Sequence, residues 1–242
     1  MLEGENVTVR FGGLTALNNV NFKVEKNRVV GLIGPNGAGK TTLFNCISGV
    51  VHPCKGDIFF NGEKITGLVP DQITKRGIAR TFQIPHPFND MTGVENVMVA
   101  ILYGRKKSVS FAESKHEAVR ILDLVGLSDK GNVMAKHYTL VDKRKLEVAR
   151  ALAVEPELIL LDEVVAGMNP TEAVEAMQLI GKIRKELHIT IFWIEHVMKA
   201  IMNVADKIIV LESGSKICEG QPKEVASDRK VISAYLGERY AF

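Results

Sequence analysis

Nine consecutive residues constrain this chain more than any others: Gly34, Pro35, Asn36, Gly37, Ala38, Gly39, Lys40, Thr41 and Thr42. They follow the apolar run Val29–Ile33 and precede Leu43–Ile47, an order that predicts a strand, a glycine-rich turn and a helix. Glycines let the backbone of such a turn direct several N–H groups into one hollow, and the helix start adds its positive dipole end. The segment therefore predicts a seat for a polyphosphate.

Two side chains of this segment have predicted roles. Lys40 is expected to lie against the β- and γ-phosphates, and the Thr41 hydroxyl is expected to bind Mg²⁺. Thr42 is either a further phosphate contact or simply a residue of the first helical turn. A chance match to the pattern occurs in about one chain in a hundred of this length. The flanking strand and helix therefore favour phosphate binding.

Composition and charge set broad limits. The chain has 242 residues, 46% hydrophobic and 24% charged, enough to bury the core of one large domain. Its net charge of +3 is spread along the sequence and gives no reason to expect a nucleic-acid partner. No apolar run reaches the ~18 residues of a membrane span, and the acidic start at Met1–Glu5 is unlike a signal peptide. We therefore expect a cytoplasmic protein, with Cys46, Cys54 and Cys218 as free thiols.

Alternating apolar residues predict two N-terminal strands, Val7–Phe11 and Val20–Val24. Phe11 ends the first of them, directly before two glycines and upstream of the phosphate seat. At this place its ring is expected to stack on a nucleotide base, which requires only the face of the ring. Spacing alone favours a core or surface phenylalanine at least as strongly.

The next elements determine where Gln83 lies. Gly56–Gly62 has the pattern of a strand closed by an Asn-Gly turn, Pro70–Arg76 that of a short helix, and Ile78–Gln83 that of a strand. Pro85 and Pro87 break regular structure directly afterwards. Gln83, at a strand end, is expected to reach a metal or a water at the γ-phosphate, with a surface amide as the alternative.

From residue 91 to residue 153 the pattern becomes helical. Apolar residues recur at helix spacing in Val94–Leu102, Phe111–Val125 and Leu146–Leu152, and no strand-like run separates them. The sequence therefore predicts a helical subdomain inserted into an α/β domain.

Two acidic residues follow the apolar run Leu158–Leu161, which predicts a strand buried on both faces. Carboxylates at such a place carry a desolvation cost unless a cation or a site uses them. Beside a phosphate seat, Asp162 is expected to hold Mg²⁺, directly or through water, and Glu163 to orient and deprotonate the attacking water. The alternative is an ordinary acidic start of a helix or loop.

A predicted helix from Pro170 to about Leu187 leads to a second buried strand, Ile189–Ile194, which is followed by Glu195 and His196. His196 lies where strand ends place catalytic groups in doubly wound sheets, and it is expected to contact the γ-phosphate. A purely structural histidine is the alternative. The remaining pattern predicts a hairpin across Lys207–Cys218 and a helix near Val231–Leu236.

Taken together, these residues resemble the nucleotide-binding subunit of ATP-binding-cassette (ABC) transporters over essentially the whole chain. Within that family, segments such as Arg80–Gln83, Arg144–Leu152, Ala166–Pro170 and Val231–Glu238 are similar to the ATPase subunits of branched-chain amino acid importers. The resemblance implies an α/β fold: a P-loop NTPase core with a parallel sheet, an antiparallel β subdomain and an inserted α-helical subdomain. It implies one domain over 1–242, with the core and β subdomain in 1–90 and 154–242 and the helical subdomain in 91–153.

The resemblance also implies roles and partners. Phe11 corresponds to the base-stacking aromatic, Gly34–Thr42 to Walker A, Gln83 to the Q-loop, Asp162 and Glu163 to Walker B, and His196 to the switch histidine. ATP and Mg²⁺ are the implied cofactors, with Thr41, Gln83 and Asp162 as metal ligands. A second cassette would sandwich two ATPs, and transmembrane permease subunits would convert closure into transport. An extracytoplasmic binding protein would act indirectly, and the subunit would lie on the inner face of the membrane.

One departure from the family concerns the signature motif, which falls on Tyr138–Asp142. Thr139 keeps a hydroxyl for the partner's ATP, but Val141 replaces a glycine and Asp142 adds a negative charge. A unit charge about 5 Å from a phosphate costs roughly 3 kcal/mol at an effective dielectric near 20. Because the signature acts in trans, we expect a heterodimer with one strong and one weak site, with a homodimer as the alternative.

Other functions remain open from the sequence. A kinase or GTPase would share the phosphate loop, but no Asn-Lys-x-Asp guanine motif occurs. DNA-repair or ribosome-associated cassettes have longer chains, with coiled-coil inserts or tandem cassettes. Related cassettes serve urea or amide import and lipopolysaccharide export, and the altered signature allows a subunit that binds ATP but hardly hydrolyses it.

Overall fold

The computed structural model describes residues 1–236 and forms ten strands and nine α-helices over that range. The strands are β1 (Leu2–Phe11), β2 (Leu14–Val24), β3 (Val29–Ile33), β4 (Lys55–Phe60), β5 (Glu63–Lys64), β6 (Ile78–Arg80), β7 (Leu158–Asp162), β8 (Thr190–Ile194), β9 (Lys207–Glu212) and β10 (Ser215–Gly220). The helices are α1 (Lys40–Ile47), α2 (Pro70–Lys75), α3 (Gly93–Gly104), α4 (Phe111–Leu124), α5 (Leu140–Ala153), α6 (Pro170–Leu187), α7 (Met198–Val204), α8 (Pro222–Ser227) and α9 (Arg229–Leu236).

A six-stranded sheet forms the centre of the molecule, in the order β10-β9-β3-β8-β7-β6. All neighbours run parallel except β10, which pairs antiparallel with β9 at one edge. Every residue of β3, β7 and β8 is buried, as in a parallel sheet covered on both faces. The carboxyl ends of β3, β6, β7 and β8 therefore meet at one edge, where binding sites of such sheets form.

A second sheet is antiparallel, in the order β2-β1-β4-β5. Asn61 and Gly62 join β4 to β5 with φ values of 51° and 83°, the left-handed conformations that a two-residue hairpin needs. Aromatic rings connect this sheet to the central one. Phe192 of β8 lies 6.0 Å from Phe22 of β2 and 5.2 Å from Phe44 of α1, between ring centroids. One apolar core thus joins both sheets and α1.

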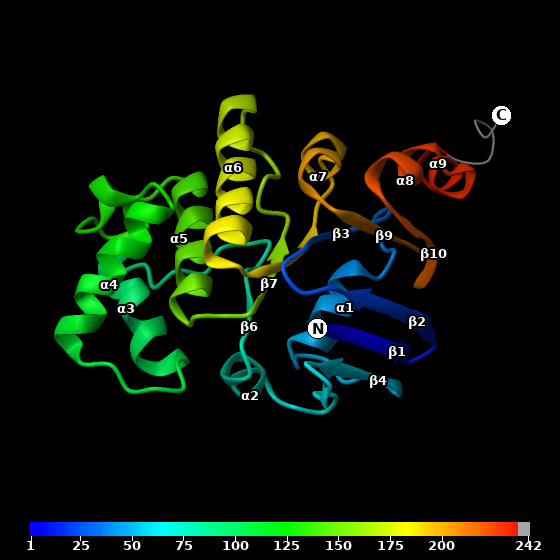
Figure 1. Cartoon of the computed structure of the whole chain (residues 1–242), viewed down its shortest axis with the longest axis horizontal. Coiled ribbons are helices and arrows are strands. Elements are labelled where there is room, and N and C mark those ends of the chain that lie inside the picture. The colour runs from blue at the N-terminus through cyan, green and yellow to red at the C-terminus, as the bar shows by residue number, and fades with distance from the viewer. Residues whose placement is uncertain (237–242) are drawn as a thin grey trace.

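Helices α3, α4 and α5 gather at one end of the molecule, away from β1, β2 and β4 (Figure 1). Each begins with a capping box, in which Thr92, Ser110 or Thr139 exchanges hydrogen bonds with an acidic residue three positions later. Arg105 holds them together, because its guanidinium donates to both carboxylate oxygens of Glu117 at 2.8 Å and to the Ala153 carbonyl at 2.7 Å. The helical pattern of residues 91–153 is thus present, and the proposed subdomain boundaries stay a prediction.

The structure confirms the α/β fold and corrects some details. The strand predicted over Ile78–Gln83 ends at Arg80, because the Thr81 N–H makes the last pairing bond, to the Leu160 carbonyl at 2.9 Å. Helices α7 and α8 have no counterpart in the sequence prediction. Gly237 and Glu238, part of the importer-like ending, lie outside the described residues. Within residues 1–236, none of the helices combines the length and apolarity that a membrane crossing requires.

The central sheet should dominate stability. Leu160 of β7 is fully buried, so Leu160→Ala is expected to cost roughly 2–5 kcal/mol of unfolding free energy through lost burial and a residual cavity. Leu14 of β2 is 67% exposed, and Leu14→Ala is expected to change it by about 0.5 kcal/mol or less. Urea unfolding followed by circular dichroism measures both; equal losses would contradict this assignment of the core.

Candidate functional site

The loop between β3 and α1 has a backbone that side chains would obstruct. Gly37 and Gly39 have φ values of 80° and 99°, in the region that favours glycine. A Cβ on Gly34 would lie 2.0 Å from the Leu211 carbonyl oxygen, and one on Gly39 would lie 2.6 Å from the Ala16 carbonyl oxygen. Helix α1 then begins at Lys40, so the loop ends at a helix N-terminus as the sequence predicts.

Lys40 is buried within this loop. Its ammonium donates to the carbonyl oxygens of Gly34 at 2.7 Å and Pro35 at 2.9 Å. Burial lowers the pKa of Lys40, while the negative charges of Glu163 and Asp162 act to raise it. The Lys40 ammonium therefore interacts electrostatically with both acidic residues from its place in the loop. Thr41, the next residue, is exposed.

Tyr235 of α9 also reaches this loop, a contact that the sequence pattern did not indicate. Its hydroxyl oxygen accepts a hydrogen bond from the Gly34 N–H at 2.8 Å, across 201 positions of sequence. Burial raises the pKa of Tyr235. The C-terminal helix thus fixes the first residue of the loop.

Asp162 closes β7 with its side chain only 2% exposed. One carboxylate oxygen, Oδ2, accepts from the Arg80 guanidinium at 3.1 Å, whereas Oδ1 is buried and has no partner in the described structure. Burial raises the pKa of Asp162, and the Arg80 cation opposes that shift. A buried carboxylate oxygen without a hydrogen bond is costly unless a cation uses it, so Asp162 fits its predicted place in a Mg²⁺ site.

Arg80, which had no role in the sequence prediction beyond the family resemblance, links three elements. Besides Asp162, its guanidinium donates to Asn45 Oδ1 of α1 at 2.7 Å and to the Oγ of Ser48, the C-cap of α1, at 2.9 Å. The end of β6, helix α1 and the acidic end of β7 are therefore fixed to one another. The residues next to Arg80 in the sequence do not indicate these contacts, since its partners are 32 to 82 positions away.

Glu163, Gln83 and His196 come together from three different segments. The Gln83 Nε2 donates to Glu163 Oε2 at 2.7 Å, and the His196 Nε2 lies 2.5 Å from Glu163 Oε1. The Glu163 side chain is 12% exposed, so solvent reaches it only narrowly. The three predicted catalytic residues thus share one place at the carboxyl edge of the sheet. Their catalytic roles, and the metal-ligand role of Gln83, stay predictions.

Phe11 and Thr139 lie apart from that group. Phe11 is 51% exposed at the end of β1. Thr139 is exposed as the N-cap of α5, and its hydroxyl bonds within the chain to the Asp142 carboxylate at 2.7 Å. Stacking by Phe11 and a contact of Thr139 in trans both stay predictions.

The Asp142 carboxylate is hydrogen-bonded and ion-paired at the start of its own helix, α5. Its Oδ2 accepts from the Thr139 N–H at 3.0 Å and pairs with the Lys130 ammonium at 2.6 Å. Burial acts to raise the pKa of Asp142, but the bonds from Lys130 and Thr139 outweigh it and leave the pKa lowered. The charge penalty of roughly 3 kcal/mol estimated for a free carboxylate is therefore largely offset by Lys130.

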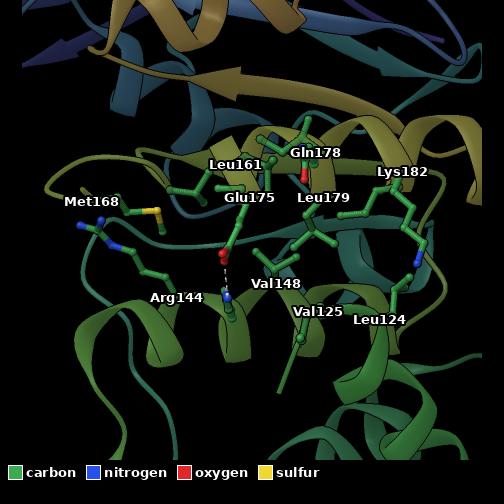
Figure 2. Close-up of a pocket in the computed structure, with 16 residues that line it drawn as sticks. Leu124, Val125, Arg144, Val148, Leu161, Met168, Glu175, Gln178, Leu179 and Lys182 are labelled. Atoms are coloured by element: carbon green, nitrogen blue, oxygen red, sulfur yellow. Dashed lines mark hydrogen bonds and ion pairs between the residues drawn. The ribbon is translucent and has the colours of Figure 1, made fainter. Parts of the chain in front are cut away.

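A cavity of about 250 Å³ lies elsewhere, between α4, α5 and α6. Figure 2 shows its mostly apolar lining, including Leu124, Val148 and Leu179. Lys145 and Glu175 also line it and form an ion pair of 3.3 Å. The lining includes no residue of the phosphate loop. This cavity lies between the helical segment and α6, and its lining includes Leu161 and Val164 but neither Asp162 nor Glu163.

Comparisons with known proteins agree with this geometry. A family model described as ABC transporter matches residues 17–166, and one described as branched-chain amino acid ATP-binding cassette transporter matches residues 215–241. The chain is 42% identical over 250 residues to BraF of Pseudomonas aeruginosa, a high-affinity branched-chain amino acid transport ATP-binding protein, with 98% of each chain covered. It is 39% identical to LivG of Escherichia coli, of the same description, with the same coverage.

Solved structures give the same result. The fold matches a nucleotide-free ATP-binding cassette from an ABC transporter with a TM-score of 0.88 and 31% identity, over 98% of this chain and 99% of that one. It also matches the ADP conformation of an ATP-binding cassette with a TM-score of 0.89 and 33% identity, with the same coverage.

The Asp142 cap predicts a pH-dependent stability difference. A lowered pKa in the folded state means that the ionised group stabilises the fold above its ordinary value of 3.8, and that this is lost as pH falls through the lowered pKa. Asp142→Asn should therefore cost roughly 1 kcal/mol near pH 7, a difference that shrinks toward acidic pH.

Urea unfolding of both proteins from pH 7 downward measures that difference. Asp90→Asn is the matched control, because Asp90 pairs with Lys136 at 3.2 Å but is 89% exposed. The control should change stability little at any pH. A cost at Asp142 that stays constant across the acidic range would contradict the proposed ionised cap.

Proposed function

This chain belongs to the ABC transporter ATPase family, and from that premise we propose that it hydrolyses ATP to drive a membrane importer of branched-chain amino acids. The match of residues 215–241 to the branched-chain amino acid model and the 42% and 39% identical relatives support this substrate class. The observation that carries the proposal is the convergence of Glu163, Gln83 and His196 beside a loop that encloses Lys40.

ATP binding would rest on the loop and Lys40. Backbone N–H groups of Gly37–Thr41 and the start of α1 face the phosphates in this proposal, and Lys40 exchanges its two loop carbonyls for phosphate oxygens. Thr41, Gln83 and Asp162 would hold Mg²⁺, which when bound supplies positive charge against the phosphates. Phe11, exposed at the end of β1, is the proposed stacking surface for the base.

Hydrolysis would depend on Glu163 as general base. Its carboxylate orients the attacking water and accepts a proton from it, while Gln83 and His196 hold the two carboxylate oxygens in place. Positioning and charge neutralisation account for most of phosphoryl-transfer catalysis, since the transition state requires little covalent chemistry from the protein. The arrangement therefore supports turnover rather than a subunit that only binds nucleotide.

Coupling to transport requires partners. We propose that a second cassette closes on this one around ATP and that permease subunits convert the closure into alternating access, with this chain on the inner face of the membrane. Val141, half-buried near the start of α5, places a branched side chain where the family has glycine. It would weaken the partner's site and so favours a heterodimer whose other subunit has an intact signature.

Replacing the proposed base tests the mechanism. Glu163→Gln keeps the shape and loses the proton acceptor, so turnover should fall by roughly 10²–10⁴-fold while ATP still binds and a closed dimer accumulates. Steady-state ATPase assays and size-exclusion chromatography with ATP measure these outcomes. Glu25→Gln, at an exposed turn, is the control with unchanged turnover. Near-normal turnover in Glu163→Gln would remove Glu163 as the base.

The heterodimer has its own test. The ATPase rate of the chain alone should be low, and addition of a cassette with an intact signature that co-purifies with it should raise the rate several-fold. Val141→Gly should raise the rate of the chain alone, because backbone can then approach the partner's phosphate. High activity of the unmodified chain alone would contradict the asymmetric pair.

A further inference from the structure

Glu195, the residue directly before His196, has a fully buried carboxylate that no role proposed above uses. Its Oε1 accepts from the Val165 N–H at 2.8 Å, and its Oε2 accepts from the N–H groups of His196 at 2.9 Å and Val197 at 3.1 Å. Three backbone donors therefore converge on one side chain. They come from two segments, the loop after β7 and the loop after β8.

The first of these segments carries Glu163 in a strained conformation. Glu163 has a φ of 52°, in the left-handed region that costs a non-glycine residue free energy. Such a conformation persists only where neighbouring contacts fix it. Two hydrogen bonds flank it: the Glu163 N–H donates to the Ile194 carbonyl at 2.9 Å, and the Val165 N–H donates to Glu195. The acceptors are Ile194, the last residue of β8, and Glu195, the residue that follows it.

The second segment carries His196, whose ring lies 2.5 Å from the Glu163 carboxylate. The bonds from the His196 and Val197 N–H groups to Glu195 fix the backbone from which that ring projects. One carboxylate thus bonds to the backbone of both loops. We propose that Glu195 is a positioning residue for ATP hydrolysis, which holds Glu163 and His196 in register through this buried bridge.

Charges around the carboxylate fit that task. Burial raises the pKa of Glu195 and the Glu163 charge acts the same way, while the three N–H bonds oppose them. Arg144 of α5 adds a positive charge nearby and donates to the Ala166 carbonyl, in the same loop as Val165. A glutamine cannot replace the group, because its NH₂ would face an N–H donor on one side of the bridge.

The inference rests on the roles proposed for Glu163 and His196, and its test compares kcat with KM. Glu195→Gln should lower kcat at least 10-fold and change the KM for ATP less than 3-fold, since the phosphate loop is untouched. Glu195→Asp should retain the bonds to His196 and Val197 but fall short of Val165, and should lower kcat by an intermediate factor. The assay uses the full chain with its partner cassette.

A double-mutant cycle tests whether Glu195 affects kcat through the Glu163–His196 pair. If Glu195 acts through the Glu163–His196 pair, then Glu195→Gln added to His196→Ala should lower kcat far less than it does alone. In nucleotide-free protein with ¹³C-labelled histidine, Glu195→Gln should move the ring signal of His196, assigned by His196→Ala, and leave the other five histidines in place. Glu117→Gln, which breaks the pair with Arg105, is the control with unchanged kcat.

Each outcome either supports or overturns the proposed role of Glu195. An active wild type with kcat of Glu195→Gln within 3-fold overturns this inference alone, whereas an inactive wild-type pair overturns the proposed function. Fully additive effects in the cycle, or a fall in kcat matched by an equal loss of ATP binding, also overturn it. Should Glu195→Gln not fold, Glu195→Asp carries the same test, and unchanged kcat in that variant rejects the bridge.

Discussion

Burying a carboxylate is costly, and this site has three acidic residues at one edge of one sheet, of which Asp162 and Glu195 are buried. The strands β3, β7 and β8 are buried along their whole length, so charged side chains can lie only where the strands end. Each acidic group there is compensated differently: Asp162 by Arg80, Glu195 by three backbone N–H groups, and Glu163 by Gln83 and His196. Because their partners differ, the three carboxylates are suited to different chemical roles.

The degree of compensation follows the proposed roles. Glu195 has no exposed surface and both its oxygens are bonded, which suits a structural bridge. Asp162 retains one buried oxygen without a partner, which suits a cation. Glu163 alone combines partial exposure with a left-handed backbone, and its partners are side chains that can move away. Each carboxylate oxygen has a further lone pair, so Glu163 can accept a proton from water while Gln83 and His196 still hold it.

Local pattern was enough to predict the phosphate loop, the acidic strand end and His196, because each is a short run whose order fixes its place in a parallel sheet. Local patterns did not predict the contacts between residues that are far apart in the sequence. Tyr235 reaches Gly34 across 201 positions and Arg80 reaches Asp162 across 82, and neither has a local signature. Glu195 follows the buried strand β8 just as Glu163 follows β7, a signal that sequence reasoning had available and assigned to no role.

Asp142 shows how a neighbour can reverse an electrostatic argument. From sequence, the Asp142 charge at the signature was an objection of roughly 3 kcal/mol, beside the loss of a glycine at Val141. The Lys130 ammonium at 2.6 Å and the Thr139 cap satisfy that charge within the chain, so most of the objection disappears. What remains is steric, because Val141 still carries a Cβ where phosphate needs close backbone. The asymmetry of the dimer therefore depends on how closely the backbone near Val141 can approach the partner's phosphate. Because this effect is steric, ionic strength should change the asymmetry little.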